Sequence, residues 1–209
     1  MGQLVDGVWQ AEGYRPPTDQ GAFQRPPSVF RDWVTADGAG GYPAAAGRYR
    51  LYVSLACPWA HRTVILRRLK GLEAAIDVVV VHPLMGEQGW GFAAAAEEPE
   101  CRPDPAIGAT HLHQLYTHAE PGCTGRVTTP TLWDTATETI VSNESADIIR
   151  MLNREFDAFA EHPERDLCPP ELTDAIDDVN EWVYADVNNG VYRTGFAETQ
   201  TAYEAAFDR

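Results

Sequence analysis

The stretch Arg48–Lys70, RYRLYVSLACPWAHRTVILRRLK, decides the fold of this chain. Its first part alternates apolar and more polar residues with the period of a strand. From residue 60 to residue 70 the apolar residues recur at helical spacing, and Gly71 then favours a left-handed end to the helix. The stretch therefore predicts a strand that is followed directly by a short amphipathic helix.

A single cysteine, Cys57, lies between the predicted strand and the predicted helix. Pro58 follows it at the first helical position, where the missing N–H of proline costs nothing. The N–H groups and the positive end of the helix dipole stabilise a thiolate at such a position. The alternative is a buried cysteine that serves only as a small apolar side chain. Because Ala60 stands where a second cysteine would complete a dithiol motif, a mixed disulfide on Cys57 needs an external thiol, such as glutathione, to release it.

Composition and charge argue against several classes of protein. The 209 residues are 44% hydrophobic and carry a formal net charge of −15, which disfavours non-specific binding to nucleic acid. The sequence has no apolar run of membrane-spanning length, and its N-terminus lacks the apolar core of a signal peptide. The four cysteines are widely scattered, and His111 and His113 form the only close pair of candidate metal ligands. We therefore expect a cytoplasmic protein with no membrane segment and no metal.

Basic residues gather around the cysteine, although the chain is acidic as a whole. Such a cluster suits an anionic ligand. Its members are Arg48, Arg50, Arg62, Arg67, Arg68 and Lys70.

The chain is expected to have three parts. Residues 1–47 have little periodic pattern and many glycines and prolines, which predicts an extended N-terminal arm. Residues 48–155 form a thioredoxin-like domain with a long insertion at 83–127, and residues 165–209 begin an all-helical domain. Aromatic residues of the arm are candidates to hold it on the body of the protein: Trp9, Tyr14, Phe23, Phe30 and Trp33.

The order of the predicted elements supports the thioredoxin-like fold. After the first strand and helix, strands are expected at 76–81, 131–133 and 139–141, and a helix at 145–153. This is a βαβ unit followed by a hairpin and a helix. Further helices are predicted at 110–118, at 171–187, and from about residue 197 to the last residue.

Two segments beyond the cysteine are candidates for binding. Thr129–Pro130 stands at the entrance to the predicted strand 131–133, where a thioredoxin-like fold places a cis-proline that exposes backbone groups to an extended peptide. The predicted helix at 145–153 starts with Ser145, whose first N–H groups suit a carboxylate, while Glu144 suits an ammonium group. The simpler role for this second segment is a cap of the helix, made by Ser142 or Asn143. Together with Cys57, it suggests recognition of an α-amino acid.

Three further residues gain meaning only from their context. Trp90 and Arg126 bracket the long insertion, and each alone is as well explained by packing or by an exposed surface. Tyr192 lies at a break between predicted helices, where a phenol reaches an adjoining cleft or is simply buried.

Several blocks of the sequence together carry a family resemblance. They are Tyr52–Arg62, Gly89–Trp90, Gly125–Thr128, Leu132–Asp134, Ile140–Ser145 and Asn189–Arg193. In this order they resemble the glutathionyl-hydroquinone reductases, which are Xi-class, omega-like glutathione transferases. The resemblance runs from about residue 30 to the last residue.

The resemblance implies a thioredoxin-like N-terminal domain, an all-helical C-terminal domain and a homodimer. It implies removal of glutathione from a glutathionyl-hydroquinone, with Cys57 as nucleophile, Tyr192 as proton donor or acceptor, and a second glutathione as co-substrate. It also implies that glutathione is bound by Trp90, Arg126, Val127, Thr128, Thr129, Glu144 and Ser145.

The sequence departs from the family in two ways. Thr129 stands where the family has an aliphatic residue before the proline, and the family continues with more helices beyond residue 209. We therefore expect the chain to be truncated within the helical domain. The sequence leaves open a broader omega-like thiol transferase that includes dehydroascorbate reduction, the use of another small thiol, and a non-catalytic scaffold of the glutathione transferase type.

Overall fold

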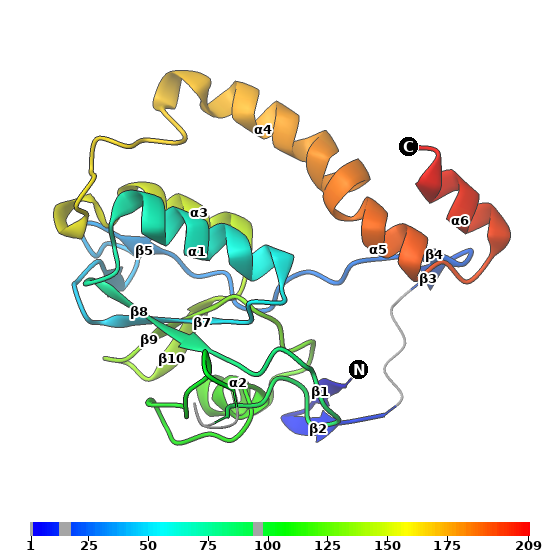
Figure 1. Cartoon of the computed structure of the whole chain (residues 1–209), viewed down its shortest axis with the longest axis horizontal. Coiled ribbons are helices and arrows are strands. Elements are labelled where there is room, and N and C mark those ends of the chain that lie inside the picture. The colour runs from blue at the N-terminus through cyan, green and yellow to red at the C-terminus, as the bar shows by residue number, and fades with distance from the viewer. Residues whose placement is uncertain (1, 13–17, 94–97) are drawn as a thin grey trace. The chain divides into compact units, whose positions relative to one another are not determined.

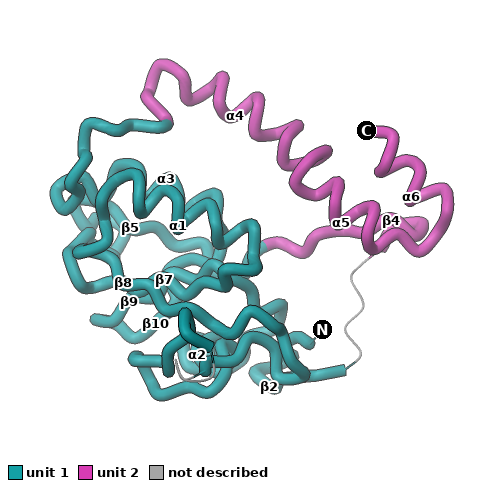
Figure 2. Tube along the Cα trace, in the orientation of Figure 1, with its two compact units in different colours: residues 1–14, 28–167 teal, residues 15–27, 168–209 magenta. Residues whose placement is uncertain are grey.

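The computed structural model describes residues 2–12, 18–93 and 98–209. It divides the chain into two compact units (Figure 2). Unit 1 comprises residues 1–14 and 28–167, and unit 2 comprises residues 15–27 and 168–209. Each unit thus combines part of the N-terminal segment with a later part of the chain.

Unit 1 is built on a four-stranded mixed sheet with the strand order β10–β9–β7–β8 (Figure 1). The central strand β7 (Tyr49–Val53) pairs in parallel with β8 (Ile76–Val80). On its other side β7 pairs antiparallel with β9 (Thr131–Asp134), which forms a hairpin with β10 (Thr139–Ser142). These strands confirm the four that the sequence predicts, to within one residue at each end.

Helices cover both faces of this sheet. Figure 1 shows α1 (Pro58–Lys70) and α3 (Ser145–Arg154) on one face and α2 (His113–Ala119) on the other. A short 3₁₀ helix, η1 (Asp157–Phe159), follows α3. The arrangement confirms the thioredoxin-like fold, in which a βαβ unit precedes a hairpin and a helix.

The alternation along β7 explains why the sheet has two hydrophobic faces. Leu51 and Val53 belong to the cluster beneath α1 and α3, whereas Tyr52 belongs to the cluster around α2. All three side chains are fully buried. Burying each apolar side chain of this size contributes roughly 1.5–3 kcal/mol. The strand therefore anchors both layers at once.

Helix α1 ends at Gly71 as its sequence predicts. Gly71 has φ 65°, and its N–H bonds back to the carbonyls of the last turn. Lys70 is fully buried and forms an ion pair of 2.6 Å with Asp157. Its ammonium also donates to the carbonyls of Pro163 and Arg165 at 3.2 and 3.1 Å. Lys70 therefore ties the segment that follows α3 to the end of α1.

The expectation that the basic cluster serves an anionic ligand is wrong for five of its six members. Arg48 forms two hydrogen bonds with Asp134, and Arg67 donates to backbone carbonyls. The other three form ion pairs with neighbouring carboxylates: Arg50 with Asp77, Arg68 with Glu73, and Lys70 with Asp157. These side chains hold the sheet and α1 together, and only Arg62 reaches the site described below.

The N-terminal segment forms short two-stranded pairs. In unit 1 these are β1 (Gln3–Val5) with β2 (Val8–Gln10) and β5 (Val34–Thr35) with β6 (Tyr42–Pro43). In unit 2, β3 (Thr18–Asp19) pairs with β4 (Ala22–Phe23).

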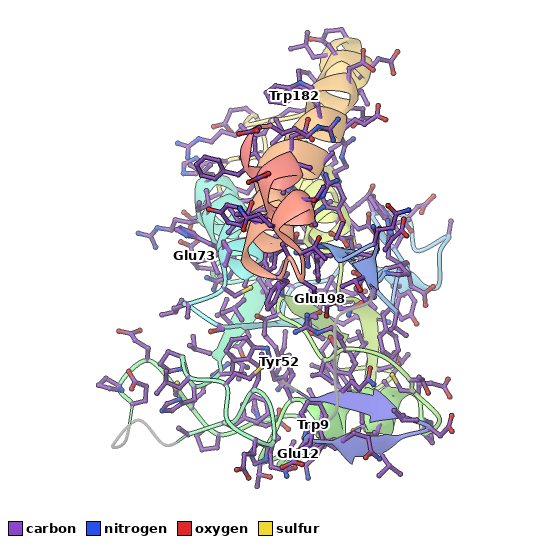
Figure 3. The ribbon with its side chains drawn as sticks, turned by 90° about the vertical axis from the view of Figure 1, so that its right-hand side faces the viewer. Trp9, Glu12, Tyr52, Glu73, Trp182 and Glu198 are labelled. Carbon is purple, nitrogen blue, oxygen red and sulfur yellow. The ribbon has the colours of Figure 1, made fainter. Side chains whose placement is uncertain are left out.

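Aromatic residues of the N-terminal segment do pack on the body of each unit. Trp9, on the β1–β2 hairpin (Figure 3), stacks on His113 with ring centroids 4.8 Å apart. Phe30 meets Tyr116 edge to face, and Trp33 packs on the cluster beneath α1 and α3. Phe23 packs within unit 2, and Tyr14 lies outside the described residues.

Unit 2 is mainly helical. The helix predicted at 171–187 is divided into η2 (Pro170–Leu172), α4 (Thr173–Trp182) and the π-helical turn η3 (Val183–Asn188). After these come α5 (Gly190–Gly195) and α6 (Gln200–Phe207). The prediction that the last helix runs to the end of the chain is wrong, because α6 stops at Phe207. Within the described ranges, no helix combines the length and the hydropathy that a membrane span requires.

Candidate active site

Cys57 occupies the position that the sequence predicts, at the junction between β7 and α1. It is the N-cap residue of α1, with extended backbone angles, and Pro58 follows at the first helical position. The Cys57 thiol is half-buried, is not in a disulfide, and makes no capping hydrogen bond to its own helix. The sulfur therefore stands at the positive end of α1 without being used to close it.

The loop before β9 brings backbone groups to this sulfur. Cys57 Sγ donates a hydrogen bond to the carbonyl of Thr129 at 3.3 Å. The Thr129–Pro130 peptide bond is cis, as the thioredoxin-like fold predicts. The Thr129 side chain is buried, and its hydroxyl forms no hydrogen bond with any described residue. The contact with Cys57 therefore runs through the backbone of Thr129 alone.

The start of α3 lies beside the start of α1. Glu144 is the N-cap of α3, and its Oε1 accepts a hydrogen bond from the Ala146 N–H at 3.1 Å. Its other carboxylate oxygen accepts from the Ser28 hydroxyl at 2.9 Å. Arg62 of α1 donates to the Ser145 hydroxyl at 3.2 Å. A carboxylate, a hydroxyl and a guanidinium thus meet at this helix end.

A buried polar network supports the loop at 127–129, and no pattern in the sequence predicts this network. The Tyr116 hydroxyl, on α2, lies 3.0 Å from the Thr128 carbonyl and 3.3 Å from the Thr128 N–H. Asn143 donates to this hydroxyl at 3.1 Å and to Thr128 Oγ1 at 3.2 Å. Burial raises the pKa of Tyr116, which keeps the phenol neutral and able to donate to the Thr128 carbonyl while it accepts from the Thr128 N–H and from Asn143. Tyr116 and Asn143 therefore fix the loop relative to the start of α3.

Trp90 and Arg126 lie on the α2 side of the sheet. Trp90 is half-buried against the cluster around α2, and its carbonyl accepts from the Leu112 N–H at 2.8 Å. Arg126 is half-buried between Gly125 and Val127. Gly125 exchanges two backbone hydrogen bonds of 2.9 Å with Leu4 of β1. The β1–β2 hairpin thus holds in place the backbone next to Arg126.

Tyr192 belongs to unit 2. Its ring packs against Phe23 with ring centroids 6.1 Å apart, and the Arg25 guanidinium lies 4.1 Å from its ring centroid. Such a cation–π contact fixes the orientation of the ring. Arg25 did not stand out in the sequence, because the tyrosine that it contacts is more than 160 residues further along the chain.

The remaining cysteines differ from Cys57 in their surroundings. Cys101 and Cys123 are buried, and burial raises the pKa of both thiols. Cys168 is half-buried in unit 2. Within residues 2–12, 18–93 and 98–209, His, Cys, Asp and Glu side chains nowhere gather in groups of three or more that suit a metal ion. Cys57 is therefore the cysteine of unit 1 whose thiol is half-buried and lies at the start of a helix.

The geometry of unit 1 combines a reactive atom with groups for recognition. The sulfur of Cys57 and the Thr129 carbonyl suit a thiol compound with an extended backbone, because such a backbone pairs with exposed main-chain groups. Glu144, Ser145 and the start of α3 add groups that suit an ammonium and a carboxylate. The site therefore suits a small peptide that carries a thiol.

Comparison with known proteins places this geometry in a family. The model of the glutathione S-transferase N-terminal domain matches residues 56–155. The chain is 53% identical over 212 residues to the glutathionyl-hydroquinone reductase YqjG of Escherichia coli, covering 99% of this chain and 64% of that protein. It is 47% identical over 207 residues to the glutathionyl-hydroquinone reductase PcpF of Sphingobium chlorophenolicum, with the same coverage of 99% and 64%.

Solved structures give the same result. A Xi-class glutathione transferase from Natrialba magadii superimposes with a TM-score of 0.88 at 45% identity, over 100% of this chain and 61% of that one. The glutathione-bound structure of YqjG from Escherichia coli superimposes with a TM-score of 0.85 at 50% identity, over 99% and 62%. The chain thus spans less than two thirds of the length of these relatives. It belongs to the glutathione S-transferase family, and within that family to the Xi class.

Proposed function

We propose that this protein removes glutathione from glutathionyl-hydroquinones and releases the free hydroquinone. The observation that carries the proposal is the position of Cys57, a half-buried thiol at the start of α1 beside the Thr129 carbonyl. Ala60 leaves the motif without a second cysteine, so the catalytic cycle needs an external thiol. The names of YqjG and PcpF, both glutathionyl-hydroquinone reductases, support this substrate class.

The groups around Cys57 divide the binding of glutathione between them. We assign the backbone of Val127, Thr128 and Thr129 to the extended part of the tripeptide, next to its sulfur. Glu144 binds the ammonium group, while Ser145 and the first N–H groups of α3 bind the neighbouring carboxylate. Trp90 and Arg126 bind the other end of the peptide. Support comes from YqjG, whose solved structure contains glutathione.

In the first step the Cys57 thiolate attacks the sulfur of the glutathionyl-hydroquinone. A sulfur–sulfur bond forms between Cys57 and glutathione, and the bond between that sulfur and the ring carbon breaks. The electron pair of the broken bond stays on the ring carbon, which takes a proton from Tyr192. The ring carbon is thereby reduced, and the two sulfur atoms are oxidised to a mixed disulfide.

In the second step a second glutathione thiolate attacks the sulfur of the bound glutathione. Glutathione disulfide leaves, the Cys57 thiolate is restored, and the proton of the incoming thiol returns to Tyr192. The net reaction converts one glutathionyl-hydroquinone and one glutathione into one hydroquinone and one glutathione disulfide. Glutathione is thus a co-substrate, and we propose that no metal takes part.

We further propose that the protein acts as a cytoplasmic homodimer on small molecules, without nucleic acid or a membrane as partner. The net charge of −15 supports the proposal that nucleic acid is not a partner, because an acidic surface repels a polyanion. The four cysteines outside disulfides support a reducing compartment.

The test is to incubate the protein with a glutathionyl-hydroquinone and glutathione, and to measure hydroquinone and glutathione disulfide by chromatography. We expect equal amounts of the two products, and mass spectrometry of the protein quenched in acid should show one glutathione on Cys57. Dehydroascorbate and a glutathione mixed disulfide serve as competing substrates. Faster turnover of either one would favour the broader omega-like thiol transferase.

The reactivity of the thiols distinguishes an enzyme from a non-catalytic scaffold. Iodoacetamide near neutral pH should label Cys57 well before Cys101 and Cys123, because burial protects these two thiols and raises the pKa of both. Labelling of Cys57 at the slow rate of the buried cysteines would favour the scaffold.

A further inference from the structure

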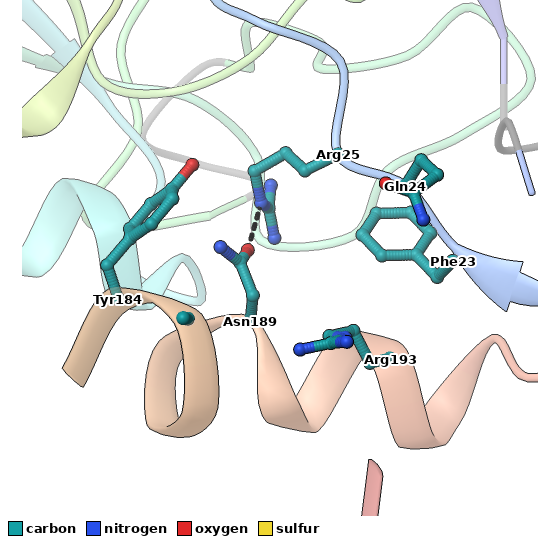
Figure 4. Close-up of a pocket in the computed structure, with 7 residues that line it drawn as sticks. Phe23, Gln24, Arg25, Tyr184, Asn189 and Arg193 are labelled. Carbon is teal, nitrogen blue, oxygen red and sulfur yellow. Dashed lines mark hydrogen bonds between the residues drawn. The ribbon is translucent and has the colours of Figure 1, made fainter. Parts of the chain in front are cut away.

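Unit 2 contains a pocket whose lining includes none of the residues that we assign to the proposed reaction. The pocket has a volume of about 340 Å³ and lies between the segment after β4 and the helical turns from η3 to α5 (Figure 4). A volume in this range holds a small organic molecule. The lining residues that matter below are Phe23, Arg25, Tyr184, Asn189 and Arg193.

The charge of the pocket is opposite to that of the protein. The chain has 31 acidic and 16 basic residues, but two of the four arginines of unit 2 line this pocket. None of the acidic residues described in unit 2 lines it. The Arg193 guanidinium forms no ion pair with any described residue. An arginine without a carboxylate partner in so acidic a chain indicates a place for an anion.

The other arginine is held in a fixed orientation. Arg25 Nε donates a hydrogen bond to Asn189 Oδ1, which Figure 4 shows as a dashed line. The Arg25 guanidinium also lies 4.1 Å from the ring centroid of Tyr192 and 5.7 Å from that of Phe23. Asn189 is only 8% exposed. Because stacking and a partly buried hydrogen bond hold it, Arg25 loses little conformational entropy when an anion binds.

Aromatic rings complete the lining. Phe23 and Tyr184 contribute rings from two different segments of unit 2 (Figure 4). Phe23 is almost fully buried, so its ring is fixed by the packing around it. Two guanidinium groups beside aromatic rings match a ligand that has a flat ring and one acidic group.

We propose that this pocket binds a small aromatic acid, with its carboxylate or sulfonate against Arg25 and Arg193 and its ring against Phe23 and Tyr184. The proposal does not depend on the chemistry assigned to Cys57. Direct binding to the protein therefore tests it, whether or not the protein turns over a glutathionyl-hydroquinone.

The experiment is a titration of 4-fluorobenzoate with the protein, followed by ¹⁹F NMR line broadening. We expect saturable binding of 4-fluorobenzoate, at least tenfold weaker binding of trifluoroacetate, which lacks the ring, and no binding of 4-fluorobenzamide, which lacks the charge. Arg193→Gln should weaken the binding of 4-fluorobenzoate at least tenfold. Binding of the amide as tight as that of the acid would overturn the proposal, and so would an absence of binding by the acid.

A matched variant distinguishes the loss of an arginine in the pocket from a change in the net charge of the protein. Arg68→Gln changes the net charge by the same amount, but Arg68 is an exposed residue of unit 1 that pairs with Glu73. It should bind 4-fluorobenzoate as the parent protein does, and an equal loss in both variants would refute the pocket. If Arg193→Gln is misfolded by circular dichroism, the parent protein still decides the question. Its affinity for the acid should fall severalfold between about 0.05 M and about 0.5 M salt, and an unchanged affinity would refute the role of the two arginines.

Discussion

The starts of α1 and α3 lie side by side in unit 1, yet they are closed in different ways. At α1 the N-cap residue is Cys57, whose thiol makes no capping bond and donates instead to the Thr129 carbonyl. At α3 the N-cap residue is Glu144, whose carboxylate accepts from the helix and from Ser28. Arg62 of α1 joins the two starts through Ser145.

This difference shows how one kind of backbone feature serves two purposes. Both helix starts present N–H groups and the positive end of a dipole. The residue at the N-cap decides what is done with them. Because the Cys57 thiol does not cap α1, its sulfur stays available to react. The Glu144 carboxylate, in contrast, caps and stabilises α3, and we propose that it also binds the ammonium group of the ligand.

The largest expected effect comes from removing the reactive atom. Cys57→Ser keeps the size of the side chain but replaces the thiol with a poor nucleophile, so hydroquinone release should fall by at least about 10³-fold. The half-buried Cys168 provides the control, because it is a free thiol to which the proposed reaction assigns no role. Cys168→Ser should retain the parent rate in the same assay. Equal rates for Cys57→Ser and the parent protein would show that the start of α1 is not reactive.

The next largest effect is expected from a substitution of Glu144 at the start of α3. Glu144→Ala removes both the cap and the proposed acceptor for the ammonium group. We expect glutathione to bind at least about tenfold more weakly in calorimetry, and the free energy of unfolding to fall by about 1 kcal/mol.

Two further variants separate recognition by Glu144 from stability. Glu144→Gln keeps an oxygen that can cap but removes the charge, so it should lose affinity for glutathione with little loss of stability. Thr199 caps α6 through the Ala202 N–H at 3.2 Å. Thr199→Ala should therefore lose stability but keep its affinity. If Glu144→Gln binds glutathione as the parent protein does, the carboxylate only caps the helix.

A smaller effect is expected at the network behind the loop. Tyr116→Phe removes the hydroxyl that holds Thr128 and Asn143, which should raise the KM for glutathione roughly threefold to tenfold and leave kcat at saturation nearly unchanged. Tyr49→Phe is the matched control, since the buried Tyr49 hydroxyl donates to the Pro43 carbonyl at 2.8 Å, away from this loop. An equal rise in KM for both variants would mean that lost stability, rather than loop position, is responsible.

The smallest effect on the site is expected at the opposite end of β7. Burial alone would raise the pKa of Asp134, but hydrogen bonds from Arg48, Thr137 and the Ala136 N–H outweigh burial and lower this pKa below its ordinary value. A carboxyl group with a lowered pKa stabilises the fold above about pH 4, and this contribution is lost as the pH falls through its folded-state pKa.

Asp134→Asn should therefore cost roughly 3 kcal/mol of unfolding free energy at pH 7, because it leaves the Arg48 charge without its partner. In urea unfolding experiments, the gap between parent and variant should narrow as the pH is lowered from 7 to about 3. Affinity for glutathione at neutral pH should stay within about twofold of the parent value. A gap that does not change with pH would show that the ion pair is not the source of the stability.

The sequence predicted the fold around Cys57 well, because local patterns determine it. The alternation in β7, the proline after Cys57 and the left-handed Gly71 are all encoded by neighbouring residues. The start of α3 was predicted in position only: the sequence favours Ser142 or Asn143 as the cap, whereas Glu144 is the N-cap and its side chain accepts from the Ala146 N–H. Such features depend on periodicity and on capping, which a sequence displays directly.

The supporting contacts were not predictable in the same way. Ser28 reaches Glu144 across 116 residues, and Arg25 reaches Asn189 across 164 residues. Tyr116 lies in the long insertion, where no periodic signal indicates what its hydroxyl meets. The basic residues near Cys57 suggest an anion site by their proximity in sequence, but this proximity does not show that Arg48 pairs with Asp134. Long-range partners follow from tertiary packing, which a single sequence does not display.

Lys70 is the only lysine among the 209 residues, and it is fully enclosed. Reagents that acylate or cross-link ε-amines should therefore find no accessible target in this folded chain. Unfolding would expose the amine, so the appearance of an ε-labelled peptide in a digest reports opening of the joint between α1 and the segment at 157–165. A single buried side chain thus gives the protein an intrinsic chemical probe of its own integrity.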